Sequence, residues 1–68
     1  MTYSFNERLK ELRIEKHMSL RQLAKETGFS DVAIGRWERG TQIPSIETLI
    51  TFAKYFNVST DYLLGLED

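Results

Sequence analysis

The feature that most constrains the fold of this chain is a serine directly before each segment with helical hydrophobic periodicity. These serines are Ser4, Ser19, Ser30, Ser45 and Ser59. A serine hydroxyl in this position accepts a hydrogen bond from a free backbone N–H of the first helical turn, so it favours the start of a helix. Glu7 lies three residues after Ser4, and Gln22 lies three residues after Ser19, which is the spacing of a capping box. Five start signals within 68 residues predict five short helices and an all-α fold.

The apolar spacing and the glycines set the expected bounds of these helices. We expect helices at about residues 5–16, 20–27, 31–39, 46–56 and 60–64. Three of them are followed by Gly28, Gly40 and Gly65, and a residue that tolerates positive φ commonly ends a helix. In the fourth helix, the pattern predicts that the inward-facing residues are Ile46, Leu49, Ile50, Ala53 and Phe56.

Length and composition are typical of a small globular binding domain. The chain forms one expected domain, residues 1–68, with a formal net charge of −1. It has no cysteine and one histidine, so we expect no disulfide, no metal site and no cofactor. A core this thin leaves little room to enclose a substrate, so we expect a binding module and not an enzyme. No apolar run approaches the roughly 20 residues of a membrane span, and we expect a cytoplasmic protein.

Residues 19–39 have the pattern of two helices of about eight residues joined by a short turn at Gly28. Leu23, Ile34 and Trp37 fall on the inner faces of these helices and can fix the angle between them. The second helix therefore keeps an outer face without a role in the core, which carries Asp31, Val32, Gly35, Arg36 and Arg39. This geometry is typical of a helix-turn-helix, whose second helix enters the major groove of DNA.

Further motifs extend along most of the chain: Arg8–Arg13, Leu23–Ala24, Gly28, Ile34, Arg36–Gly40, Pro44–Ser45, Leu49, Ala53–Lys54, Val58–Ser59 and Leu63–Leu64. With these motifs the sequence resembles the lambda-repressor/Cro-like (XRE) family of bacterial and phage transcriptional regulators. The most specific of them is the run Trp37–Gly40 followed by Pro44–Ser45. The resemblance implies a compact five-helix DNA-binding domain over residues 1–68, with its helix-turn-helix at about residues 19–39. It also implies a sequence-specific transcriptional regulator, with repression as the expected effect.

The resemblance implies roles for individual residues. The base-reading residues would be Asp31, Val32, Ala33 and Arg36. Guanine would suit Arg36, and thymine methyl groups would suit Val32 and Ala33. The residues at the DNA backbone would be Arg21, Gly35, Arg39, Thr41 and Gln42. A partly buried ion pair between the first and third helices would join Arg13 and Glu38.

The chain departs from the family pattern at two positions. Leu20 stands where the family often has glutamine, and Asp31 stands where a polar or basic side chain is common. These departures keep a second hypothesis open, in which the same fold is a protein-interaction module of antirepressor or antitoxin type with a weakened DNA face.

Charge is distributed unevenly along the chain. Residues 1–43 hold eight Lys and Arg against six Asp and Glu, whereas residues 44–68 hold one Lys against four acidic residues. The positive excess therefore lies in the half with the helix-turn-helix, as phosphate binding requires. Because the excess is small, we expect weak nonspecific binding to DNA with a shallow dependence on salt.

A single module of this kind reads too few bases to find one site in a genome. We therefore expect a homodimer on a pseudo-palindromic operator, with half-sites about 34–36 Å apart. The expected dimer surface consists of Tyr62, Leu63, Leu64 and Leu66. Dimerisation through it can be weak and driven by DNA.

Overall fold

The computed structural model describes residues 4–67 and shows five helices and no strand in that range. The helices are α1 (Phe5–Glu15), α2 (Leu20–Thr27), α3 (Asp31–Arg39), α4 (Ile46–Phe56) and α5 (Thr60–Leu64). The all-α prediction is confirmed, and only the first helix ends one residue earlier than expected. The two ends of the predicted domain, residues 1–3 and 68, lie outside the described residues.

Four of the five predicted serine caps are present. The hydroxyls of Ser19, Ser30, Ser45 and Ser59 each accept a hydrogen bond from the backbone N–H three residues later. At α2 the capping box is complete, because the Gln22 side chain also accepts from the Ser19 N–H at 2.7 Å. Each such cap contributes about 1 kcal/mol, which matters in a domain with a thin core.

The capping box predicted at Ser4 is wrong. Ser4 has φ −111° and ψ 22°, and its side chain makes no cap hydrogen bond. Its backbone N–H instead donates to the Leu64 carbonyl at 3.2 Å, which ties the start of α1 to the end of α5. The approach is close, because a Cβ atom added at Gly65 would lie 2.6 Å from the Ser4 hydroxyl oxygen. A tertiary contact has replaced the local cap.

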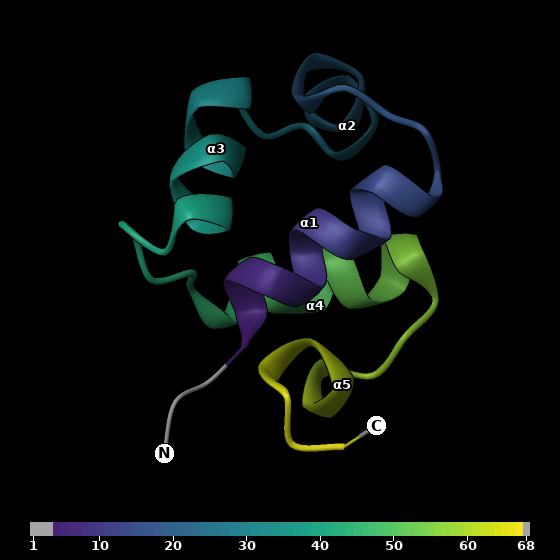
Figure 1. Ribbon diagram of the computed structural model, residues 1–68, viewed down its shortest axis with the longest axis vertical. Coiled ribbons are helices and arrows are strands. Elements are labelled where there is room, and N and C mark those ends of the chain that lie inside the picture. The colour runs from purple at the N-terminus through teal and green to yellow at the C-terminus, as the bar shows by residue number, and fades with distance from the viewer. Residues whose placement is uncertain (1–3, 68) are drawn as a thin grey trace.

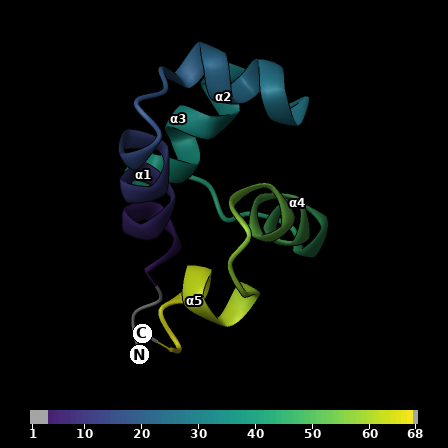
Figure 2. The same ribbon diagram turned by 90° about the vertical axis from the view of Figure 1, so that its right-hand side faces the viewer.

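The helices surround one core centred on aromatic side chains. Helix α1 packs against α3 and α5, α2 packs against α3 and α4, and α4 packs against α5 (Figures 1 and 2). The ring of Phe52 lies 5.1 Å from that of Phe29 and 5.8 Å from that of Trp37, between centroids, and Phe5 and Phe56 lie at 6.2 Å. Trp37 is buried, as its helical register predicts. This core fixes the orientation of α3 from its inner side.

The predicted inner face of α4 is partly wrong. Ile46 and Ile50 are exposed, whereas Thr48 and Phe52 are buried together with Ala53 and Phe56. Apolar residues occupy most of the circumference of α4, so periodicity alone allows two stripes. The aromatic cluster decides between them, because Phe52 has several ring partners in the core and the isoleucines have none. No helix of residues 4–67 is both long enough and apolar enough to cross a membrane.

Candidate nucleic-acid interface

Helices α2 and α3 form a helix-turn-helix held by a short, specific turn. Gly28 ends α2 with φ 83°, a left-handed conformation that costs a side-chain-bearing residue about 1 kcal/mol or more. Phe29 follows and sets its ring edge-to-face against Trp37 of α3, with 5.1 Å between centroids. Small Ala24 is buried in the core beside Leu23. The turn therefore packs into the core and holds the two helices at a fixed angle.

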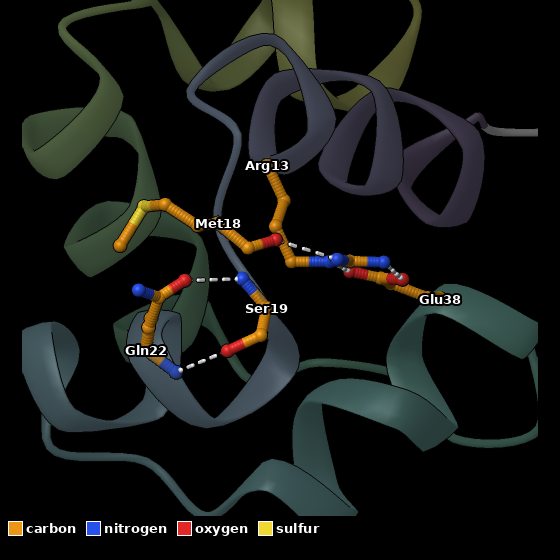
Figure 3. A network of polar contacts seen from close by, with 5 residues as sticks. All are labelled: Arg13, Met18, Ser19, Gln22 and Glu38. Carbon is orange, nitrogen blue, oxygen red and sulfur yellow. Dashed lines mark hydrogen bonds and ion pairs between the residues drawn. The ribbon is translucent and has the colours of Figure 1, made fainter.

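An ion pair fixes α3 relative to α1 and the start of α2 (Figure 3). The Arg13 Nε and Nη2 atoms donate to the two carboxylate oxygens of Glu38 at 2.7 and 2.9 Å. Arg13 Nη1 donates to the Met18 carbonyl at 2.8 Å, in the turn that leads to the Ser19 cap. The hydrogen bond to Glu38 raises the pKa of Arg13, and burial opposes this effect. The ion pair that the resemblance implies is thus present, and Arg13 has a second anchor at the Met18 carbonyl that no sequence pattern predicts.

The outer face of α3 is open to solvent. Asp31, Val32, Arg36 and Arg39 are all exposed, and 56% of the surface of Val32 is accessible. Ala33 differs from the other predicted base-reading residues, because it is half-buried and packs against the hydrophobic core. The remaining side chains form a continuous helical face that no part of residues 4–67 covers.

A depression of about 260 Å³ lies on this face, between α3 and the first turn of α2. It is lined by Leu20, Asp31, Val32, Gly35 and Arg39. Gly35 is buried at its floor, where a Cβ atom would lie 3.1 Å from Arg39 Nη1 and 3.8 Å from Leu20 Cδ1. The lining therefore combines apolar Leu20 and Val32 with the Asp31 carboxylate, and the Arg39 guanidinium lies against Gly35. The role of Leu20 in this depression requires the packing of α2 on α3, which the sequence alone does not give.

The predicted backbone-contacting residues border the same face. Arg21 is exposed in the first turn of α2, and Thr41 and Gln42 are exposed in the loop after α3. The Thr41 backbone N–H and hydroxyl both donate to the Arg36 carbonyl, at 3.0 and 3.2 Å. These bonds hold the loop against the end of α3. Three arginines against one aspartate give the surface a positive local charge in a chain whose net charge is −1.

Neither a cluster of metal ligands nor the single histidine of residues 4–67 belongs to this face. Residues 4–67 contain no group of three or more His, Asp or Glu side chains placed to hold a metal ion. His17 is exposed in the turn after α1, with φ 56°. It lies in a separate shallow depression beside Lys16, Lys25 and Tyr55.

A five-helix domain that presents an uncovered helix after a tight turn defines the class of helix-turn-helix DNA-binding domains. The family model described as "Helix-turn-helix" matches residues 9–63, and the chain belongs to this family, of the XRE type. The family and the fold are those of DNA-binding transcriptional regulators and not of enzymes.

Curated relatives support the family assignment. The chain is 41% identical over 64 residues to the HTH-type transcriptional activator BcrR of Enterococcus faecalis, which covers 94% of this chain and 31% of the relative. It is 43% identical over 51 residues to repressor protein C2 of Salmonella phage P22, covering 72% of this chain and 24% of that protein. The chain thus spans less than one third of the length of these two relatives.

Solved structures show the same fold. The P22 c2 repressor in complex with a synthetic operator has a TM-score of 0.84 and 35% identity, over 93% of this chain and 96% of that one. The biofilm regulator SinR in complex with DNA has a TM-score of 0.80 and 34% identity, over 88% and 97% of the two chains.

Proposed function

We propose that this domain is the sequence-specific DNA-binding part of a transcriptional regulator, with α3 in the major groove. The observation that carries the proposal is the uncovered outer face of α3, bordered by the first turn of α2 and the loop after α3. The similarity to a repressor solved with an operator and to a regulator solved with DNA supports it. A regulator of this kind works where the genome lies, so we place it in the cytoplasm.

Base reading is assigned to three exposed side chains of α3. Arg36 has the planar pair of donors that matches O6 and N7 of guanine, a contact that discriminates by about 1–3 kcal/mol. Val32 presents an apolar surface to a thymine methyl group, and Leu20 extends that surface across the depression. Asp31 accepts a hydrogen bond from the amino group of cytosine. Ala33 is assigned a minor methyl contact at the edge, since it is half-buried.

Phosphate contacts are assigned to the border of the face. Arg21 and Arg39 supply charge, Gln42 supplies a side-chain donor, and the positive end of the α2 dipole points to the same side. Thr41 keeps its loop in place through its bonds to Arg36, and its hydroxyl can turn from the Arg36 carbonyl to donate to a phosphate oxygen. Gly35 contributes by having no side chain, which allows the backbone of α3 to approach the DNA closely.

Three base-reading side chains give too little discrimination for a genome, so we propose that two copies bind a pseudo-palindromic operator. Half-sites about 34–36 Å apart place both copies on one side of the duplex. We place repression ahead of activation, because a domain bound over a promoter excludes polymerase without any further surface. Relatives of both kinds exist, since BcrR is named an activator and C2 a repressor.

The proposal is tested by selecting duplexes from a random pool and titrating the selected duplex by mobility shift at two salt concentrations. Arg36→Ala is expected to weaken binding about 5- to 150-fold for each half-site, the equivalent of about 1–3 kcal/mol per contact. The control is Lys10→Ala, which removes an exposed positive charge from α1 and is expected to leave affinity unchanged.

The rival function is a protein-interaction module on the same fold, favoured by Leu20 and by the carboxylate of Asp31 on the exposed face. That function predicts no selected sequence and no retarded complex at low salt. Either result with the folded parent protein would contradict the DNA-binding proposal.

A further inference from the structure

Three isoleucines close together in the sequence are exposed to solvent. Ile43, in the loop before α4, is 79% exposed, and Ile46 and Ile50, one turn apart on α4, are 76% and 42% exposed. We call these three residues the isoleucine surface. It lies where the loop from α3 enters α4 (Figure 1). The core does not use these side chains, because α4 buries a different stripe with Phe52 and Phe56.

The stretch that carries Ile43 and Ile46 has no charge, and Glu47 lies between Ile46 and Ile50. Residues 41–46 contain none of the charged side chains that make up 28% of the chain. An interface between two identical copies about a two-fold axis places residues near the axis against their own symmetry mates, so a charge there would repel itself. The nearest charges on the exposed side of α4 are Glu47 and Lys54, which have opposite signs and can attract across such an axis.

The isoleucine surface also adjoins the proposed DNA interface. Ile43 directly follows Thr41 and Gln42, the loop residues assigned to phosphate. A protein bound beside this loop is therefore bound next to DNA. Two copies on half-sites about 34–36 Å apart can touch where their longest dimension lies along the duplex, because the Cα atoms of one copy span 30 × 24 × 20 Å before side chains are added.

We propose that the isoleucine surface is the contact by which a second copy of this chain binds on the neighbouring half-site. The proposal rests on the proposed function and replaces the dimer surface predicted at the C-terminal end. Leu63 is wrong as a member of that surface, because it is fully buried. Leu64 and Tyr62 are half-buried: the Leu64 carbonyl accepts from Ser4, and the Tyr62 ring lies under the Arg8 guanidinium at 4.4 Å. Leu66 is the one exposed residue of the predicted four.

The size of the surface determines when the contact forms. Stable protein interfaces use about 20–30 residues on each side, and the apolar part here is three isoleucines. The copies are therefore separate in free solution and associate on DNA, where two adjacent half-sites hold them at high effective concentration. The contact appears as cooperativity of DNA binding.

The experiment compares affinity for a selected duplex with two half-sites against the same duplex with one half-site scrambled. The two-site preference of the parent is expected to exceed the statistical factor by about tenfold, equivalent to about two buried methylene groups per complex. Ile46→Glu is expected to abolish the excess, because the two introduced carboxylates face each other. The control is Ile14→Glu, which changes an isoleucine on α1 that is 52% exposed and lies outside the surface.

A mixture of Ile46→Glu and Ile46→Lys proteins provides a second, independent test. Each variant alone is expected to bind without cooperativity, whereas the mixture regains it through attraction across the axis. The proposal is overturned by a parent without excess two-site preference, by an Ile46→Glu protein that keeps it, or by a mixture that does not regain it. In each of these outcomes single half-sites are still bound, so the proposed function stands; loss of all binding by the parent would instead refute that function.

Discussion

The ion pair between Arg13 and Glu38 is expected to be one of the largest single contributions to the stability of this domain. Glu38→Ala leaves a guanidinium that is 14% exposed with the Met18 carbonyl as its remaining hydrogen-bond partner. Arg13→Met leaves a carboxylate that is 7% exposed without either of its two donors. Removing one partner of a buried pair costs about 3–5 kcal/mol, and partial exposure places each variant near the lower end, at about 3 kcal/mol.

A domain of this length has a total stability of about 3–10 kcal/mol. Each single variant is therefore expected to lose about a third or more of this stability, and at the lower end of the range it lies close to its unfolding midpoint in water. The double variant Arg13→Met/Glu38→Ala removes both charges, and its cost is expected to be about 2–3 kcal/mol smaller than the sum of the single costs. An arginine of the unfolded chain is charged at neutral pH, and the raised pKa of Arg13 keeps it charged in the folded domain, so its protonation adds no pH dependence there.

The assay is urea unfolding followed by the fluorescence of Trp37, which is the sole tryptophan of the chain and is buried beside the pair on α3. If the free energy of unfolding falls with urea concentration at the same slope in all four proteins, the variants change stability and not the surface exposed on unfolding. Single costs below about 1 kcal/mol, or costs that simply add in the double variant, would refute the assignment of the pair as a coupled anchor.

Three further predictions concern the DNA face and the core. Gly35→Ala is expected to raise the free energy of unfolding in urea by about 1 kcal/mol through helix propensity, since the one close atom belongs to a flexible arginine side chain. The same variant is expected to weaken binding of the selected duplex at least tenfold. Unchanged affinity would show that the backbone at Gly35 is distant from DNA. Leu63→Ala should cost about 3 kcal/mol in the same unfolding assay, because Leu63 is fully buried, whereas Leu66→Ala should cost less than about 0.5 kcal/mol; similar costs would contradict the placement of α5. In a mobility-shift titration of the two-site duplex, the logarithm of the binding constant should fall with the logarithm of the salt concentration with a slope of about −4, from Arg21 and Arg39 in each copy. A slope steeper than about −8 would mean that the phosphate contacts are wrongly assigned.

Local signals predicted the helices well because each start is decided within four residues. A serine hydroxyl and the third N–H of a helix are close whatever the rest of the chain does, and four of the five caps formed as expected. Ser4 is the exception, because the end of α5 lies against it and supplies a carbonyl acceptor. No local rule contains that contact, since Leu64 is sixty residues away in the sequence.

The exposed face of α3 could also be predicted from the sequence, because a nine-residue helix with Ile34 and Trp37 inside leaves one outer face. The depression beside Leu20 and the isoleucine surface could not be predicted from the sequence. The first needs the distance between α2 and α3, and the second needs the rotation of α4 about its axis. That rotation is decided by the rings around Phe52, which come together from three helices and the turn at Phe29.

Amide chemical-shift mapping with the selected duplex is the sharpest test that the outer face of α3 reads DNA. In a ¹⁵N–¹H titration, the largest changes are expected in the first turn of α2, along residues 31–39, and at residues 41 and 42. Amides of α1 around Ile14 are expected to remain unchanged. Large changes confined to α1 or α5, with the α3 amides unmoved, would contradict the account.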